Sequence, residues 1–348
     1  MSDTASTATK YLQNLWDQAE AFKLAAHPLE LLRYRSNLLG ADLRITNFGG
    51  GNTSSKFTLP DPLTGKSVRV LAVKGSGGDL RSIGASGFAV LYLDKVEQLL
   101  GRYRGEAHED EMVGFYPLCA FGENRVASSI DTPLHALLPF DHVDHLHPDW
   151  CIALAASANG EKKIEELNAR YGRHIVWVPW QRPGFELGVM LRLAVEEHPG
   201  CDGILLGSHG LFTWGATQHE CYANSLKTID HRFIVDDVRT VLPRLARKGE
   251  KFDVIILDPP TFSRAPGGKT FQIEHDFENL LIAALQLAER DSHLLLSTNC
   301  SALREHALEV MARYCLKAAR RAATFHRPPQ LPDFPSGAGA SSIWLRLR

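Results

Sequence analysis

The sequence lacks the features that mark membrane, secreted and disulfide-stabilised proteins. Its longest apolar runs, such as CIALAASA at 151–158, are far shorter than the roughly 20 residues that a membrane-spanning helix needs. The N-terminal stretch has no basic segment followed by an apolar one, so no secretory signal is visible. The 6 cysteines form no C-x-x-C pair and no disulfide-framework spacing, which suits a reducing compartment. We therefore expect a cytoplasmic protein that makes no contact with a membrane.

The chain also lacks internal repeats, low-complexity tracts and a dominant sign of charge. Its 348 residues, 44% hydrophobic and 22% charged, are enough to build two hydrophobic cores. The net charge of −2 conceals an asymmetry: residues 231–348 contain 17 Lys and Arg against 13 Asp and Glu, and residues 1–230 contain 21 against 27. This difference predicts two segments with separate origins, divided near Asp230.

Hydrophobic periodicity predicts an α/β protein in both segments. In the first, we expect amphipathic helices at 8–25 and 28–38, followed by a strand, a glycine turn and a second strand in LRITNFGGGNTSSKFTL. In the second segment, elements of the two types alternate, with strands expected at 233–238, 252–262 and 293–300 and helices at 275–290 and 302–320. Such alternation is typical of an open parallel sheet.

Three histidines suggest a metal site. His145 and His147 are two residues apart in DHVDHLHPDW, so on an extended segment both side chains project to the same face. An H-x-H pair alone also fits a hydrogen-bonded surface pair. His209, however, follows an apolar strand in LLGSHGLFTWG and adds a third imidazole. Three protein ligands with one open position are the arrangement of a catalytic zinc site.

Five motifs in order resemble the class II aldolase/adducin family: GGGNTSSK, VKGSGGDL, SSIDTPLH, HVDHLHPD and SHGLFTWG. In detail, residues 8–230 resemble the aldolase half of bacterial bifunctional rhamnulose-1-phosphate aldolase/alcohol dehydrogenases. The resemblance implies a three-layer α/β/α fold, a tetrameric homo-oligomer, and Zn²⁺ or another divalent metal at His145, His147 and His209. It also implies cleavage of a ketose 1-phosphate, with L-rhamnulose 1-phosphate favoured, to dihydroxyacetone phosphate and L-lactaldehyde. No dehydrogenase half is present, so we expect no use of NAD.

The resemblance also implies further site residues. It places the substrate phosphate against glycine turns and hydroxyl donors at Gly51, Asn52, Ser76, Gly77, Ser128 and Ser129. The general acid/base corresponds to Asp131, where relatives carry a glutamate that is one methylene longer. Asp131 is also placed to cap the helix that TPLHALL predicts, and Glu111 is the other candidate. The adducin branch keeps this fold without zinc ligands as a non-catalytic binding protein, an alternative against which the three histidines argue.

The second segment resembles a different enzyme. FDVIILDPPTF and STNCS are similar to motifs of class I S-adenosylmethionine methyltransferases, in particular the 23S rRNA cytosine-C5 enzymes. This resemblance implies a Rossmann-like α/β segment in which Asp237 and the run Asp258, Pro259 and Pro260 bind S-adenosylmethionine. Cys300 is then the nucleophile that attacks cytosine, or else an inert buried thiol.

Nothing in 231–348 matches the first two strands of such a methyltransferase or its glycine-rich cofactor loop. The strand expected at 252–262 should therefore present an open apolar edge, with half of the cofactor pocket absent. We interpret the segment as a truncated methyltransferase joined to an aldolase. It would bind S-adenosylmethionine and RNA only if another chain supplied the missing strands.

Overall fold

The computed structural model describes residues 9, 11–47, 49–230, 237–264, 270–328 and 339–348. The chain divides into two compact units, residues 1–233 and 234–348. Among the described residues, no helix has the length and apolar character required to cross a membrane.

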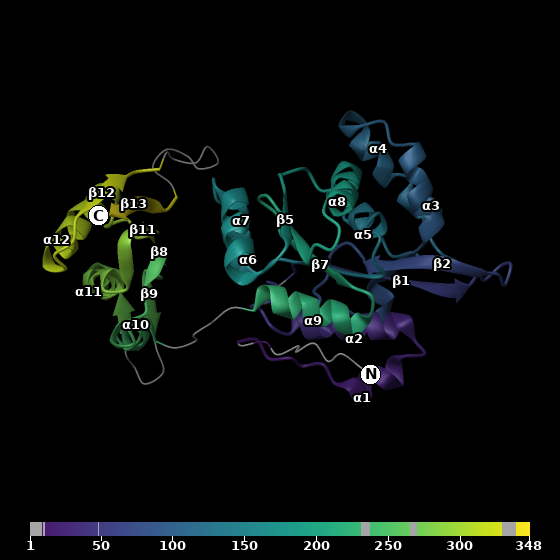
Figure 1. Ribbon diagram of the computed structural model, residues 1–348, viewed down its shortest axis with the longest axis horizontal. Coiled ribbons are helices and arrows are strands. Elements are labelled where there is room, and N and C mark those ends of the chain that lie inside the picture. The colour runs from purple at the N-terminus through teal and green to yellow at the C-terminus, as the bar shows by residue number, and fades with distance from the viewer. Residues whose placement is uncertain (1–8, 10, 48, 231–236, 265–269, 329–338) are drawn as a thin grey trace. The chain divides into compact units, whose positions relative to one another are not determined.

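The first unit is built on a seven-stranded mixed sheet with the strand order β3-β2-β1-β4-β7-β6-β5 (Figure 1). Its strands are β1 Asn52–Pro60, β2 Ser67–Lys74, β3 Phe88–Tyr92, β4 His142–Leu146, β5 Ile175–Val178, β6 Gly203–Leu206 and β7 Leu211–Gly215. Only β5 and β6 pair in parallel; the other neighbours are antiparallel.

Helices cover both faces of this sheet. They are α1 Gln18–Leu24, α2 Pro28–Gly40, α3 Leu93–Gln98, α4 Glu109–Val113, α5 Thr132–Ala136, α6 Asp149–Ala155, α7 Gly160–Tyr171, α8 Phe185–Glu197 and α9 Gln218–Ile229. Short 3₁₀ turns occupy Ala85–Gly87, Leu99–Gly101, Glu106–His108 and Tyr116–Cys119. Helices α2 and α9 lie on one face, and α5 and α8 lie on the other (Figure 1). The predicted α/β/α layering is confirmed.

The side chains of β4 point alternately into the two layers, and this alternation positions the site. Val143 packs into the core beneath α5 and α8, whereas Leu146 belongs to the core on the α2 and α9 side. Because side chains alternate along a strand, His145 shares the face of Val143, and Asp144 points to the opposite layer.

Of the helix predicted over 8–25, residues 8 and 10 lie outside the described residues, and the prediction is wrong for 11–17. The helix begins only at Gln18, where the Asp17 side chain accepts hydrogen bonds from the first-turn backbone N–H groups. The preceding chain is held outside a helix because the backbone N–H groups of Tyr11 and Leu12 donate to Asp230 Oδ1, at 2.9 and 2.7 Å.

The strand predicted at LRIT is also wrong. Residues 43–46 form turns, and the Ile45 N–H donates to the Asp42 carbonyl at 2.9 Å. The Arg44 guanidinium folds back onto the Asp42 carboxylate, so the segment is closed on itself. Among the described residues of this stretch, the only strand is β1, which starts at Asn52.

The second unit contains a four-stranded sheet with the order β12-β13-β11-β8 and a separate β9–β10 pair. Its elements are α10 Val238–Arg247, β8 Phe252–Leu257, β9 Phe262–Arg264, β10 Thr270–Gln272, α11 Ile273–Leu285, β11 Ala288–Thr298, α12 Glu305–Ala318, β12 Ala323–His326 and β13 Ser341–Leu347. Helices α11 and α12 supply the core against β11 and β13.

The expected open parallel sheet is only partly correct. Strands β8 and β11 are parallel, but β13 enters between β11 and β12 and pairs with both in antiparallel fashion. The C-terminal strand therefore completes a mixed sheet. Of the strand expected at 233–238, residues 233–236 lie outside the described residues, and Asp237 instead caps α10.

The apolar edge expected on the strand at 252–262 is present at β8, in the described part of this unit. Strand β8 ends the sheet order, and Phe252, Val254 and Ile256 are 40%, 53% and 56% exposed. In a fully wound α/β sheet, such a strand would be covered by neighbouring elements.

His135 provides a test of the buried layer of the first unit. Its ring is fully buried, Nδ1 lies 2.8 Å from Ser54 Oγ, and burial lowers its pKa to about 3. The unfolded chain takes up this proton near pH 6.5, so stability should fall as the pH decreases from about 6.5 toward 3. We predict that His135→Gln makes this decline shallower by up to about 1.4 kcal/mol per pH unit, the limit for one proton.

The measurement is urea unfolding of metal-free wild type and variant between pH 4.5 and 6.5, followed by tryptophan fluorescence. Five of the 6 tryptophans lie in the first unit, so the signal reports mainly on that unit. Parallel pH dependences for the two proteins would show that His135 is not the group responsible.

Candidate metal centre

The three predicted histidines come from two segments that the sheet places side by side. His145 lies in β4 and pairs with Phe212 of β7, and His147 follows one residue after β4 ends. His209 lies in the tight turn between β6 and β7. A Cβ atom on Gly210 would lie 2.6 Å from His147 Cδ2 and 2.8 Å from His145 Cε1, so only glycine allows the turn to approach both rings.

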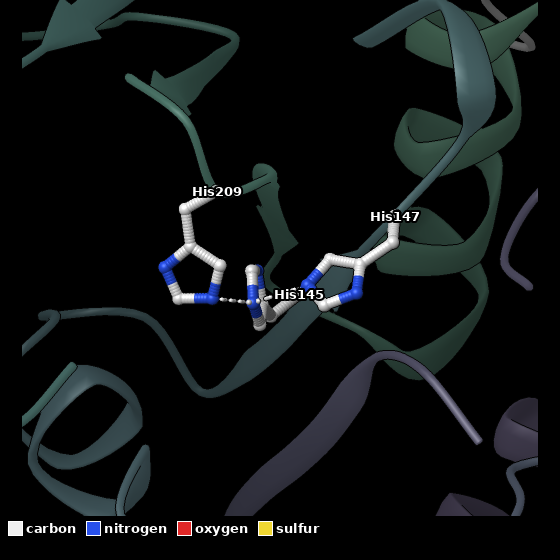
Figure 2. A group of neighbouring side chains, drawn as sticks. All are labelled: His145, His147 and His209. Carbon is white, nitrogen blue, oxygen red and sulfur yellow. Dashed lines mark hydrogen bonds between the residues drawn. The ribbon is translucent and has the colours of Figure 1, made fainter. Parts of the chain in front are cut away.

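The ring nitrogens converge on one point (Figure 2). His145 Nε2 lies 3.2 Å from His209 Nε2 and 3.0 Å from His147 Nε2, and one nitrogen from each ring lies within 4.8 Å of the others. Three nitrogens that bind one zinc at about 2.0–2.1 Å in tetrahedral directions are separated by roughly 3.3 Å. The spacing of the donors therefore fits a single cation.

The protonation of these rings also fits metal binding. Burial is the main cause that lowers the pKa of all three: His145 well below its ordinary value, His147 to about 4, and His209 below its ordinary value. Neutral imidazole is the form that binds metals. His145 Nδ1 lies 3.3 Å from the Leu211 carbonyl, where donation of its proton leaves Nε2 as the free electron pair.

Asp131 lies beside this cluster. It precedes α5, but its side chain makes no capping hydrogen bond there, so capping does not account for the residue. Burial raises the pKa of the Asp131 carboxyl, and the His209 charge, the Asn52 hydrogen bond and Lys74 oppose that rise. Ser129 Oγ also donates to Asp131 Oδ2, at 3.4 Å. A shielded carboxyl next to the histidines can hold or release a proton.

The predicted phosphate-binding turns assemble around Asp131. Asn52 opens β1 directly opposite His145, and its side chain binds Asp131. The second glycine turn lies against the SSID segment, because Gly75 bridges to Ser128 and the Ser76 N–H donates to the Ala127 carbonyl at 2.9 Å. Left-handed backbone, with φ near +79° and +75°, occurs at Gly51 and Gly77. The structure thus gathers the six predicted phosphate residues into neighbouring loops.

Lys74 is a site residue that the sequence analysis missed. It ends β2 immediately before the glycine turn and is 5% exposed. Its charge acts on Asp131 and His147, and burial lowers its own pKa. The available signal was its position directly before GSGG, at the open end of an apolar strand.

Glu111 lies in a different environment from Asp131. Its carboxylate forms ion pairs with Arg104 at 2.6 Å and His108 at 2.8 Å, and its side chain is 52% exposed. Those partners lower its pKa. The structure does not bring Glu111 into the group formed by Asp131, Asn52 and the histidines.

The candidate residues of the second unit follow the ends of its strands. Asp258, Pro259 and Pro260 come directly after β8, and Cys300 follows the parallel neighbour β11. Cys300 is buried, with Sγ 3.6 Å from Glu274 Oε1. Asp237 caps α10 and forms an ion pair with Arg239 at 2.8 Å.

Comparisons with known proteins agree with the first unit's architecture. Residues 32–228 match the family model described as "Class II Aldolase and Adducin N-terminal domain". Over 218 residues, 63% of the chain, the sequence is 40% identical to "Uncharacterized oxidoreductase YuxG" of Bacillus subtilis, of which 31% is covered. The N-terminal class II aldolase domain of a conserved protein from Thermoplasma acidophilum superposes with a TM-score of 0.52 and 27% identity, covering 64% of this chain and 95% of that one.

A further match involves a methyltransferase. Over 116 residues, 33% of the chain, the sequence is 33% identical to "Ribosomal RNA large subunit methyltransferase I" of Aeromonas hydrophila, of which 29% is covered. The chain therefore spans less than one third of the length of either curated relative.

We predict that the metal-free protein binds one Zn²⁺ and that His145→Ala or His209→Ala reduces its affinity at least about 100-fold, because one of three donors is lost. Binding is measured by titration calorimetry and by metal analysis after dialysis. His198→Ala, at an exposed histidine outside the cluster, is the matched control and should bind like wild type. Stoichiometric zinc retained by either cluster variant would contradict the assignment.

Proposed function

Because the chain belongs to the class II aldolase and adducin family, we propose that its first unit is a metal-dependent aldolase that cleaves a ketose 1-phosphate. The observation that carries this proposal is the convergence of three neutral imidazoles: His147 Nε2 and His209 Nε2 lie 3.0 and 3.2 Å from His145 Nε2, beside the buried carboxyl of Asp131. A purely structural histidine cluster would not require a shielded acid/base beside it.

In this proposal, one ring nitrogen each of His145, His147 and His209 binds a divalent cation. The cation supplies Lewis-acid stabilisation of the negative charge that develops on the substrate when its carbon–carbon bond breaks. The three rings keep the neutral form at pH 7 because burial opposes their protonation. The protein's contribution at this point is a fixed, uncharged donor set.

Asp131 carries the proton. Cleavage leaves the electron pair of the broken C3–C4 bond on C3 of the dihydroxyacetone phosphate half, and the C4 hydroxyl loses its proton as the aldehyde forms. A carboxyl with a raised pKa is suited to exchange such protons. The shorter aspartate is compatible with this role, because its carboxyl already forms a hydrogen bond with the Asn52 side chain and interacts electrostatically with His209.

The loops around Asp131 bind the phosphate in this proposal. Backbone N–H groups of glycine turns and serine hydroxyls form a cradle that suits an anion. The donors come from Gly51, Asn52, Ser76, Gly77, Ser128 and Ser129. We add Lys74, because it directly precedes the second glycine turn and its charge acts on Asp131. We propose L-rhamnulose 1-phosphate as the substrate, on the motif resemblance, with dihydroxyacetone phosphate and L-lactaldehyde as products, and a homotetramer as the working form.

We predict that Asp131→Asn lowers kcat for aldol cleavage by about 100-fold or more, the usual contribution of a positioned acid/base, while zinc binding is retained. Dihydroxyacetone phosphate release from L-rhamnulose 1-phosphate and a panel of other ketose 1-phosphates is followed in a coupled assay. Glu111→Gln is the matched control, because it neutralises the exposed carboxylate, and should change kcat less than about twofold. Undiminished turnover by Asp131→Asn would remove this residue from the mechanism, and failure of the zinc-loaded wild type on every ketose phosphate would end the proposal.

The methyltransferase match supports a second, weaker candidate function. For this candidate, β8 and the Asp258–Pro260 run would form one side of the cofactor site, but no strand pairs with the outer edge of β8 in the described residues. We propose that this chain alone does not transfer methyl groups.

We therefore predict no saturable heat when S-adenosylmethionine is titrated into the purified protein. Saturable binding, if it were lost in Asp258→Ala, would instead show that the second unit carries a working cofactor site.

A further inference from the structure

The strand that carries the metal ligands is anchored from its other face by a buried ion pair. We propose that Arg35 and Asp144 are positioning residues that set the location of β4, and hence of His145 and His147. The inference rests on the proposed function only in taking these histidines as metal ligands. Among the described residues, the hydrogen bonds and ion pair of the Arg35 and Asp144 side chains go to other partners than the three imidazoles, so both residues act through the strand.

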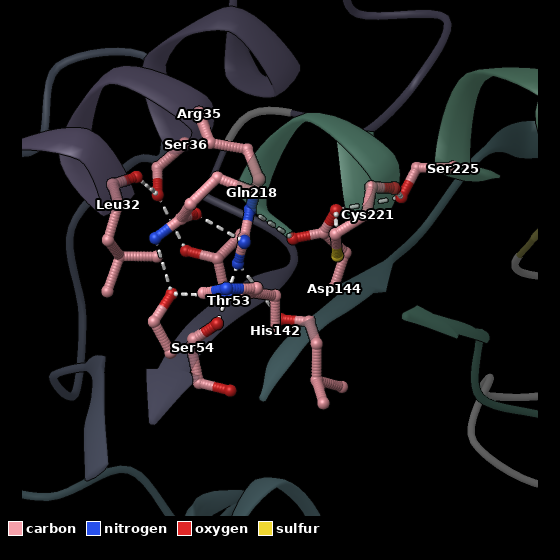
Figure 3. Close-up of polar contacts among 12 residues, drawn as sticks. Leu32, Arg35, Ser36, Thr53, Ser54, His142, Asp144, Gln218, Cys221 and Ser225 are labelled. Atoms are coloured by element: carbon pink, nitrogen blue, oxygen red, sulfur yellow. Dashed lines mark hydrogen bonds and ion pairs between the residues drawn. The ribbon is translucent and has the colours of Figure 1, made fainter. Parts of the chain in front are cut away.

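The geometry of the pair connects it directly to the ligands. Asp144 precedes His145, and strand alternation turns its side chain toward α2 and α9. There Arg35 Nε lies 3.1 Å from Asp144 Oδ1, and both side chains are 0% exposed (Figure 3). A displacement of this carboxylate moves the backbone of the adjacent histidine with it.

Arg35 joins α2 to two neighbouring strands. Its Nη2 donates to the Ser54 carbonyl of β1 at 2.7 Å and to the Val143 carbonyl of β4 at 3.4 Å. Its Nη1 donates to the Gln218 side chain at the start of α9. The planar guanidinium therefore fixes the spacing between β1 and β4, which is the pair that also aligns Asn52 with His145.

Asp144 extends the same connection to α9. Its Oδ2 accepts hydrogen bonds from Ser225 Oγ at 2.8 Å and from Cys221 Sγ at 3.2 Å, both on α9. Helix α9 follows β7, the strand that begins two residues after His209. Ser225 Oγ also lies 2.7 Å from Thr213 Oγ1 of β7, so the network connects β4 to the strand that follows His209. Figure 3 shows Asp144 between Arg35 and the α9 side chains of Cys221 and Ser225.

Stability alone does not explain this network. Removing two charges from water opposes folding, and well-packed apolar residues in place of a buried ion pair often leave stability unchanged or raised. What apolar residues cannot reproduce is the direction and reach of the hydrogen bonds that Arg35 makes. Metal ligands must be held within about 0.5 Å of their working positions, and directional bonds next to a ligand meet that requirement.

The test separates positioning from stability. The double variant Arg35→Met/Asp144→Leu removes both charges together, so no unpaired charge is left buried. We expect it to fold with a Tm within a few degrees of wild type, to bind Zn²⁺ at least about tenfold more weakly in chelator competition, and to give an altered visible absorption spectrum with Co²⁺. Wild-type zinc affinity together with a wild-type cobalt spectrum would overturn the proposal.

Two further variants keep the test decisive. Arg35→Lys retains the charge without the planar fork, and we expect a folded protein with weakened zinc binding and a shifted cobalt spectrum. If the double variant does not fold, Arg35→Lys becomes the deciding test, because an unchanged cobalt spectrum in this variant would also overturn the proposal. Leu32→Ala is the control for stability. Leu32 is fully buried on the same helix and packs against Val70 of β2 and Phe88 of β3, so its truncation should lower Tm without changing either metal readout. A spectrum altered equally in Leu32→Ala would reduce the pair to a structural role.

These readouts are independent of catalysis. If wild type binds zinc but cleaves no ketose phosphate, the aldolase proposal fails while the positioning role can still be measured. If wild type binds no metal, the histidine assignment itself fails, and with it the positioning role. An effect confined to Tm would overturn the positioning role alone.

Discussion

The close approach of three uncharged imidazoles is the constraint on which the first unit's site depends. With Nε2 atoms 3.0 and 3.2 Å apart, protonation of any two rings would set like charges against each other in a buried place. Burial resolves the conflict by keeping the rings neutral, and neutral rings present lone pairs to a common point. The fold supports this arrangement with Gly210, which removes the side chain that would otherwise separate the turn from β4.

Strand β4 serves two layers at once. Its His145 side contributes to the candidate metal centre, and its Asp144 side is bound into a polar network with α2 and α9. The central position of β4 between β1 and β7 makes this division possible, because backbone hydrogen bonds on both edges already hold the strand in plane. The side chains then have only to fix how far β4 lies above or below the sheet plane and how it is rotated about its own axis.

The two units differ in how completely their sheets are covered. The sheet of the first unit has helices on both faces, and its central strands are buried. In the second unit, β8 carries three exposed apolar residues at the sheet edge, although Asp258 and Cys300 keep their places after two parallel strands. The ends of these two parallel strands are therefore kept side by side in a sheet whose outer strand is left uncovered.

The sequence by itself determined the α/β class, the shared face of His145 and His147 and the glycine turns, because these follow from local side-chain periodicity and backbone preference. It misassigned the LRIT strand and the first half of the opening helix, where side chains such as Asp42 and Asp230 capture the backbone. Only the tertiary structure decided that His209 joins the pair across 64 residues, that Asp131 rather than Glu111 lies beside them, and that β13 enters its sheet antiparallel. Those outcomes depend on strand register and on contacts between distant segments, which no local pattern encodes.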